Sequence, residues 1–205
     1  MRNSIREEEI IRLAKQDLKQ EGKAVSNLAN ILNENFLQAI EVIRNCQGKV
    51  VVAGLGKGGR VGTKIAASFS SLGTPAFFLH ADEALHGDSG AVTGKDVLIV
   101  ISHSGKTSEV LAFMDIMKKI GSPIISITGK KDCTLARMAD VALTTEVSQE
   151  ADPMNLAPTT SAITALALGD VLAICLSRLK EFSKEDFTFY HPGGALGERL
   201  SKEEK

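Results

Sequence analysis

The chain has 205 residues, of which 43% are hydrophobic and 24% are charged, and its formal net charge at pH 7 is −1. This length suits one compact domain with a full hydrophobic core and leaves little room for a second. The balance of charge supplies neither a basic patch for nucleic acid nor a polybasic segment for anionic lipid. We therefore expect no nucleic-acid partner and no membrane partner.

Secretion signals and covalent frameworks are also disfavoured. Cys46, Cys133 and Cys175 are odd in number and far apart, which argues against a disulfide framework or a zinc ribbon. Residues 1–9 are charged and lack the apolar run of a signal peptide. The most apolar segment, residues 161–177, is interrupted by a Gly-Asp pair, and we expect it to fall short of a membrane span. The sequence thus predicts a cytoplasmic protein.

Residues 1–48 have a helical pattern. Their apolar residues recur at steps of three and four, which places them on one face: Leu28, Ile31, Leu32, Phe36, Ile40 and Ile43. Gly22 and Gly48 punctuate two candidate helices. We expect this helical segment to pack on a domain formed by residues 49–200.

From residue 49 onward, short β-branched runs alternate with helical patterns. The predicted strands are residues 50–53, 76–79, 96–101, 123–127 and 141–144, and the predicted helices are residues 60–72, 108–120 and 155–181. The strands are continuously apolar, which indicates burial on both faces and hence a parallel sheet covered by helices. The predicted fold class is α/β, and the tail from residue 182 on is predicted to lack regular structure.

Ligands of open parallel sheets bind at the carboxyl ends of the strands, so the segments that follow the strands are the candidate site. These segments are residues 54–59, 80–89, 102–107, 128–132 and 145–160.

The first of these segments matches the pattern G-x-G-x-x-G, with Lys57 inside the turn. Glycines there let backbone N–H groups approach an anion at a helix N-terminus. A dinucleotide site would also need an acidic residue at the end of the second strand, where Leu79 and His80 stand instead. A nicotinamide cofactor is therefore disfavoured. Lys57 is either a ligand-binding cation or a solvated surface lysine.

The segment after the third strand carries hydroxyls at Ser102, Ser104, Thr107 and Ser108, with Gly105 between them and a predicted helix directly afterwards. Hydroxyl and backbone donors together with the helix dipole suit a phosphate dianion. The alternative is an ordinary helix N-cap, but a cap needs only one hydroxyl. The pattern favours a phosphate-binding loop.

Four other residues stand out. His80 and His86 flank two acidic residues, but no further metal-ligand set accompanies them, and a core or capping role is favoured for His80. Glu150 lies at the ligand edge, between the last strand and the closing helix. His191 begins a Gly- and Pro-rich turn at residues 191–197, and such a turn fixes a backbone path that a free tail does not need.

Five blocks of the sequence, taken together, resemble a known family. They are Gly54-x-Gly56-Lys57-x-Gly59, His80-x-x-Glu83-Ala84-x-His86-Gly87-Asp88, Ser102-x-Ser104-Gly105-x-Thr107-Ser108-Glu109, Leu156-Ala157-Pro158-Thr159-Thr160-Ser161 and His191-Pro192-Gly193-Gly194-Ala195-Leu196-Gly197. This set resembles the sugar isomerase (SIS) domain of bacterial arabinose-5-phosphate isomerases. The resemblance extends from about residue 22 to residue 200.

The resemblance implies a flavodoxin-like three-layer α/β/α sandwich, assembled as a homotetramer, that interconverts ribulose 5-phosphate and arabinose 5-phosphate without a cofactor or a metal. Its implied catalytic residues are Lys57, Glu109, Glu150 and His191. Its implied contacts to substrate and phosphate are Gly56, Ser102, His103, Ser104, Thr107 and His86. Aldose–ketose isomerisation passes through an enediol, so Glu150 and His191 would share the proton transfers while Lys57 supplies positive charge, and either of the two can take the carbon proton.

This sequence departs from the family at several positions. Members commonly have asparagine at His103, glutamate at Lys106, proline at Ala81 and cysteine at Asp152. These departures bear on the exact substrate, so an isomerase of another pentose, hexulose or heptulose phosphate is the alternative. A non-catalytic sugar-phosphate sensor is a second alternative. Long members carry a pair of CBS domains after the last motif, and this sequence resembles the short form.

The tail carries apolar residues that cannot form a core alone: Phe187, Phe189, Tyr190 and Leu196. We expect them to pack on another surface, which the resemblance assigns to a neighbouring subunit. His191 would then complete the partner's site. The alternative is that the tail folds back on its own subunit.

Overall fold

The computed structural model describes residues 6–194, 197 and 199. Its centre is a parallel sheet of five strands, β1 (Val50–Gly54), β2 (Ala76–His80), β3 (Val97–Ile101), β4 (Ile124–Thr128) and β5 (Val141–Thr144). The strand order is β2-β1-β3-β4-β5, which is the flavodoxin-like order. The predicted α/β class with a parallel sheet is therefore confirmed.

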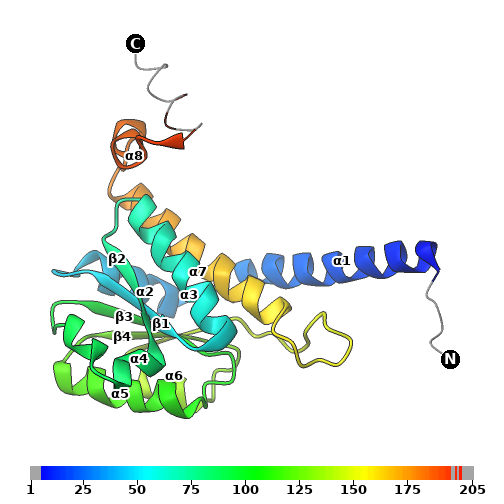
Figure 1. The fold of residues 1–205 in the computed structure, drawn as a ribbon, viewed down its shortest axis with the longest axis horizontal. Helices are drawn as coiled ribbons and strands as arrows, with labels where there is room; N and C mark the ends of the chain where they lie inside the picture. Colours follow the sequence, from blue (N-terminus) through cyan, green and yellow to red (C-terminus); the bar gives the residue numbers. More distant parts are fainter. Residues whose placement is uncertain (1–5, 195–196, 198, 200–205) are drawn as a thin grey trace.

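Helices cover both faces of this sheet (Figure 1). One layer contains α2 (Glu34–Arg44), α3 (Gly56–Ser71) and α7 (Thr160–Leu179), and the other contains α4 (Ala81–Leu85), α5 (Ser108–Ile120) and α6 (Thr134–Met138). Along β1, Val50 and Val52 join the core under the first layer, whereas Val51 and Ala53 join the core under the second. This alternation explains why the strands are apolar at every position.

The N-terminal segment is divided at a different point from the one predicted. Gly22 lies inside α1 (Glu7–Ile31), and the break comes at Leu32 and Asn33, before α2. The side chain of Asn33 accepts a hydrogen bond of 2.9 Å from the N–H of Asn35 and so begins α2. A glycine inside a helix costs only about 1 kcal/mol relative to alanine, which a long helix tolerates.

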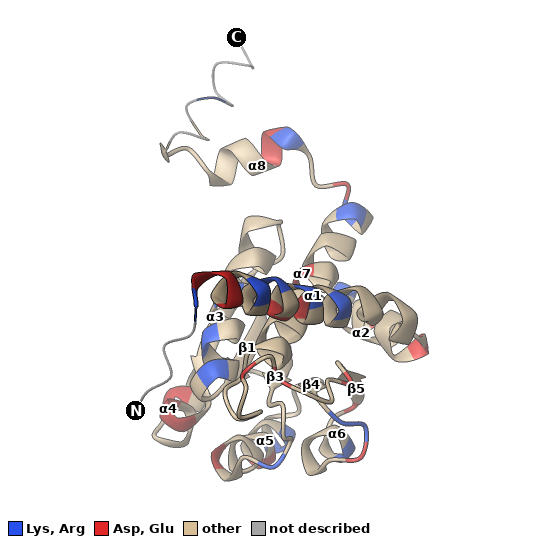
Figure 2. Cartoon of the chain, turned by 90° about the vertical axis from the view of Figure 1, so that its right-hand side faces the viewer, with Lys and Arg blue, Asp and Glu red and all other residues tan. Residues whose placement is uncertain are grey.

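The N-terminal part of α1 extends away from the sandwich, and basic and acidic residues alternate along it (Figures 1 and 2). Three of its apolar side chains, Ile10, Ile11 and Leu18, are more than half exposed. Its C-terminal part packs beside α7, with Leu28 in the core.

Several other boundaries differ from the sequence-based expectations. The closing helix α7 begins at Thr160, five residues later than predicted, because Asp152 holds the N–H groups of Leu156 and Ala157 in a loop. The short helices α4, α6 and η1 (Asp88–Ala91) were not predicted. They have too few residues to establish a helical period.

The prediction of a tail without regular structure is wrong for residues 184–190. They form helix α8 (Lys184–Tyr190), which begins with a reciprocal capping box between Ser183 and Asp186. This capping box was the overlooked signal. Residues 195 and 196, which belong to the predicted turn and apolar tail, lie outside the described residues, as does the predicted domain end at residue 200.

The apolar segment was also expected to fall short of a membrane span. By length and composition this expectation is wrong, because the helix is long and apolar enough to cross a membrane. Within the described residues, α7 has 20 residues and a mean hydropathy of 1.8 in its most apolar window. It is nevertheless a core helix, because Leu168, Leu172 and Leu176 are buried. A Cβ on Gly169 would overlap Ile65, so α7 lies in close contact with α3. Core helices of soluble proteins pass the same test.

Candidate functional site

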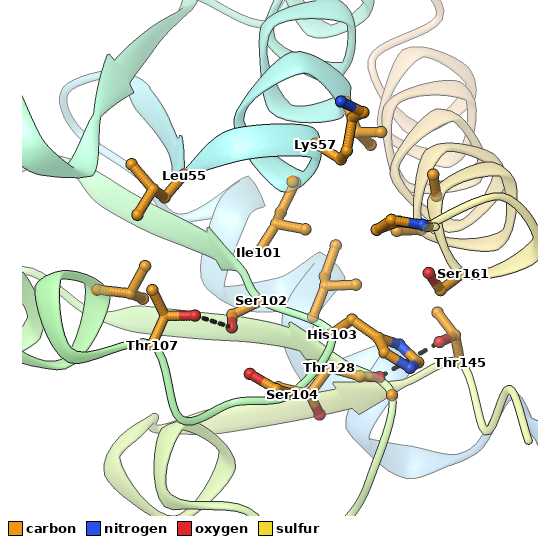
Figure 3. A pocket seen from close by; sticks show the side chains of 18 residues that line it. Leu55, Lys57, Ile101, Ser102, His103, Ser104, Thr107, Thr128, Thr145 and Ser161 are labelled. Carbon is orange, nitrogen blue, oxygen red and sulfur yellow. Dashed lines mark hydrogen bonds between the residues drawn. The ribbon is translucent and has the colours of Figure 1, made fainter. Parts of the chain in front are cut away.

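A cavity of about 300 Å³ opens at the carboxyl ends of β1, β3, β4 and β5 and includes the boundary between β1 and β3 (Figure 3). In the order β2-β1-β3-β4-β5, this is the point at which the direction of chain progression reverses, where such sheets bind ligands. Four of the five predicted segments contribute to it. The polar and charged side chains that line it are Lys57, Ser102, His103, Ser104, Thr107, Thr128, Thr145 and Ser161.

The Gly-rich segment after β1 brings α3 against the sheet. A Cβ on Gly58 would lie 3.1 Å from the carbonyl of Ile101, and one on Gly59 would lie 3.1 Å from the carbonyl of Gly54. Gly56 has a φ of 57° in open space, so glycine permits the turn that begins the helix. Lys57 is the second residue of α3, and in Figure 3 it lies across the cavity from Ser104 and Thr107.

In the segment after β3, the hydroxyls of Ser102 and Thr107 contact each other, and no side chain caps α5. Thr107 is the N-cap residue, yet its Oγ1 lies 3.2 Å from Oγ of Ser102 instead of capping the helix. The N–H of Gly105 donates to Ser102 Oγ at 3.2 Å, and the N–H of Lys106 donates to Ser104 Oγ at 3.3 Å. These contacts favour the phosphate-loop interpretation over the N-cap alternative.

Gly105 is essential to the shape of this loop. Its φ is 61°, and a Cβ there would overlap Cys133. The carbonyl of Gly105 accepts a hydrogen bond of 3.0 Å from the N–H of Leu135, so α6 supports the loop from below. The loop therefore presents its hydroxyls on a fixed backbone beside the N-terminus of α5, where the first N–H groups of the helix lack intrahelical partners.

His103 lies over the ends of β4 and β5. Its carbonyl accepts a hydrogen bond of 3.0 Å from the N–H of Gly129, and its ring is close enough that a Cβ on Gly129 would overlap it. Its side chain is exposed to the cavity beside Thr128 and Thr145 (Figure 3).

Glu150 is a buried carboxylate at the N-terminus of α7, with an exposed fraction of 8%. Its Oε2 accepts hydrogen bonds from the N–H of Thr159 at 2.9 Å and from the N–H of Ser161 at 3.0 Å. Burial raises the pKa of the Glu150 carboxyl, but the hydrogen bonds from Ser161 and Thr159, aided by the charge of His103, outweigh it and lower the pKa below its ordinary value. Glu150 is thus an ionised group held behind Ser161, which lines the cavity.

Glu109 is partly exposed in the first turn of α5 and is not among the cavity-lining residues. Its Oε2 accepts a hydrogen bond of 2.9 Å from Ser108 Oγ. Its own backbone N–H, followed by Ser108, lowers the pKa of its carboxyl. It borders the hydroxyl loop without entering the cavity.

His80 and His86 lie outside the cavity. His86 is exposed at the end of α4, and His80 precedes that helix, with its ring edge against Phe78. Among the described residues, no group of three His, Cys, Asp or Glu side chains is placed to hold a metal ion.

His191 lies far from the cavity of its own chain. Its Nε2 is 2.8 Å from Oγ of Ser71, and its ring stacks on Phe187 at 3.9 Å between centroids. Ser71 is the last residue of α3, whereas Lys57 is near its beginning. Helix α8 lies beyond the end of α7, away from the sheet (Figures 1 and 2).

Sequence reasoning did not single out Thr128, Thr145 and Ser161 as site residues. All three line the cavity, and all three lie in or beside segments that follow strands β4 and β5. The rule that ligands bind at strand ends placed Thr128 and Thr145 within the candidate segments, and Ser161 directly after the last of them, but it does not rank residues within a segment.

The SIS domain model matches residues 43–175 of this chain. KdsD of Escherichia coli (strain K12), an arabinose 5-phosphate isomerase, is 47% identical over 186 residues, which cover 91% of this chain and 57% of that protein. KdsD of Pseudomonas aeruginosa is 46% identical over 192 residues, which cover 94% of this chain and 59% of that protein. The chain therefore spans less than two thirds of the length of these curated relatives.

Two solved structures match over nearly their whole length. The protein c3406 of E. coli CFT073, in complex with arabinose 5-phosphate, has a TM-score of 0.89 and 42% identity, covering 92% of this chain and 100% of that one. A putative sugar-phosphate isomerase of Listeria monocytogenes has a TM-score of 0.89 and 34% identity, covering 93% and 100%. Together with the flavodoxin-like sheet and the hydroxyl loop at its switch point, these matches show that the chain belongs to the SIS-domain family.

Proposed function

We propose that this protein is a cofactor-independent aldose–ketose isomerase that interconverts ribulose 5-phosphate and arabinose 5-phosphate. The observation that carries the proposal is one cavity of about 300 Å³ with a hydroxyl loop on one side, Lys57 on the other and the ionised Glu150 behind Ser161. This volume is at the lower end of the range for small-molecule sites, about 300–1,000 Å³, and suits a small substrate. The relatives named arabinose 5-phosphate isomerase and the sugar-phosphate complex of c3406 support the choice of sugar.

In this proposal the phosphate of the sugar binds to the loop from Ser102 to Thr107. Hydroxyl donors and the N-terminus of α5 stabilise a dianion there. Backbone N–H groups near Gly56 and the imidazole of His103 complete the substrate contacts. Binding the phosphate at a fixed distance from the reacting carbons supplies energy for their orientation.

The reaction itself moves protons between two adjacent carbons. A base removes the proton from C2 of the aldose while the C1 carbonyl oxygen gains a proton, which forms the enediol. The hydroxyl on C2 then loses its proton and C1 gains one, which forms the ketose, so no oxidant or reductant is consumed. We assign these transfers to Glu150 and His191, and the stabilisation of the developing oxyanion to Lys57. Glu109, in the first turn of α5 beside the hydroxyl loop, is the fourth proposed catalytic residue.

We further propose that the active form is a homotetramer in the cytoplasm, in which His191 serves the site of a neighbouring subunit. Two observations support this assignment. His191 is at the far end of α3 from Lys57, and Phe189 and Tyr190 are 78% and 60% exposed on α8, where they would pack on a partner. His86, exposed outside its own cavity, would also contact substrate from a neighbouring subunit.

The test is to incubate the protein with ribulose 5-phosphate and follow the formation of arabinose 5-phosphate by NMR. We expect conversion in both directions to the same equilibrium mixture without added cofactor. Binding of either sugar phosphate without turnover would contradict the proposal and indicate a sensor. Faster turnover of a hexulose or heptulose phosphate would correct the substrate but leave the reaction unchanged.

A further inference from the structure

The segment that carries Glu150 is irregular, and hydrogen bonds to Asp152, Asn155 and Thr159 hold it from within. It runs from the end of β5 at Thr144 to the start of α7 at Thr160 and contains neither helix nor strand. The hydrogen bonds from Thr159 and Ser161 to the Glu150 carboxylate depend on where the backbone of Glu150 lies. A proton-transfer group needs a fixed position, so the contacts of this backbone matter for the reaction.

Both backbone polar groups of Glu150 are held by side chains. The N–H of Glu150 donates to Oδ1 of Asn155 at 2.8 Å, a contact within the same segment. The carbonyl of Glu150 accepts a hydrogen bond of 3.0 Å from Nε2 of Gln20, which is also 3.5 Å from the carbonyl of Gln149. Gln20 belongs to α1, which precedes the residues that match the SIS domain model.

The space around this contact makes the hydrogen bond important. A polar cavity of about 440 Å³ separates α1 from the start of the segment, and Gln20, Lys23, Asn27 and Thr160 line it together with residues 145–149. Apolar packing between α1 and the segment is therefore incomplete here. The Gln20 amide joins α1 directly to the segment. Without it, the carbonyls of Gln149 and Glu150 would have water as a donor, or none.

We propose that Gln20 is a positioning residue that holds the Glu150 backbone, so that the first helix forms part of the catalytic framework. The proposal rests on the proposed isomerase function. It predicts that a side chain of the same size without a donor will displace Glu150, whereas one that keeps a donor will not.

The variants that test this are Gln20→Glu, which is nearly isosteric but presents a carboxylate to the two carbonyls, and Gln20→Lys, which keeps a donor. Gln16→Glu, one turn earlier on an exposed part of α1, is the matched control. We expect Gln20→Glu to lower kcat by about 10- to 100-fold with KM within about twofold, a size typical of a misplaced catalytic group. We expect Gln20→Lys and Gln16→Glu to remain close to wild type.

The pH profile and a direct titration separate positioning from a general loss of structure. In Gln20→Glu the Glu150 carboxyl should lose its N–H donors, so its pKa rises and the acid limb of kcat moves to higher pH. The same rise should appear in a ¹³C NMR titration of the Glu150 carboxyl, assigned with Glu150→Gln, whether or not the protein turns over a sugar phosphate. An unchanged Glu150 titration in Gln20→Glu overturns the proposal. Equal losses in Gln20→Glu and Gln20→Lys, with a lower Tm in both, also overturn it.

Discussion

Nε2 of His191 lies 2.8 Å from Oγ of Ser71, and Nδ1 of the same ring lies 2.7 Å from the carbonyl of Phe187. Both ring nitrogens therefore have a partner, one on Ser71 at the C-terminal end of α3 and one on Phe187 of α8. Lys57 stands near the N-terminal end of that helix, about 21 Å away along its axis at 1.5 Å per residue. Within this chain, His191 and Lys57 cannot act on one substrate in this arrangement, so a shared site needs a second subunit.

Complementation between inactive variants tests this relationship. His191→Ala and Lys57→Ala should each be inactive alone. If His191 acts on the neighbouring subunit, mixed oligomers should recover part of the activity, because some sites then receive neither substitution. Activity is measured after subunit exchange that mass spectrometry has verified.

The control for complementation is a mixture of His191→Ala with the double variant carrying both substitutions, which should recover nothing. Absence of recovery in the first mixture, with exchange verified, would mean that the histidine serves its own chain.

Substitution of Glu150 tests the proton-transfer assignment. Glu150→Gln keeps an acceptor for the Thr159 and Ser161 N–H groups but removes the charge, so we expect kcat to fall by about 10²–10⁴-fold. Glu146→Gln, in the same segment and paired with Lys131 on the surface, should change kcat little. Steady-state kinetics measures both. A Glu150→Gln enzyme within tenfold of wild type would refute the assignment.

Substitution of Ser104 tests the phosphate loop. Its hydroxyl faces the cavity and accepts one hydrogen bond from the N–H of Lys106. Ground state and transition state share the phosphate, so Ser104→Ala should raise KM about tenfold or more while kcat stays within about twofold. The control is Ser70→Ala, which removes a serine hydroxyl at the C-terminal end of α3, away from the cavity, and should change KM little. Equal effects on kcat and KM, or none, would argue against phosphate binding at this loop.

The sequence predicts the sheet better than the helices, for a physical reason. Strands such as β3 are buried on both faces, so their continuous apolar runs identify them, whereas the strand order, and with it the switch point, is seen in the structure. Side-chain hydrogen bonds, some local and some between distant residues, decide the rest. The local cap at Asn33, and not Gly22, sets the break between α1 and α2. The contact between Gln20 and Glu150 spans 130 residues. The separation of His191 from its own cavity likewise depends on where α8 lies in space.

The last prediction concerns Asp96, which fixes the turn before β3. Its carboxylate accepts hydrogen bonds from the N–H of Lys49 at 2.8 Å and the N–H of Thr93 at 2.7 Å, and it is 1% exposed. Burial raises the pKa of Asp96, but the hydrogen bonds from Lys49 and Thr93 outweigh it, so the pKa in the folded state lies below that in the unfolded state. The ionised group therefore stabilises the fold above the unfolded pKa, near 3.9, and this contribution is lost as pH falls through the folded pKa.

We expect Asp96→Asn to lower the free energy of unfolding by about 1–3 kcal/mol at pH 7, because the amide presents N–H groups to backbone donors. The difference from wild type should shrink as the pH is lowered from about 5, since protonation of Asp96 removes the same charge. Denaturant unfolding at a series of pH values measures this, with Asp115→Asn on exposed α5 surface as the control. A difference that stays constant down to the acid limit of folding would show that shape, and not charge, is what Asp96 contributes.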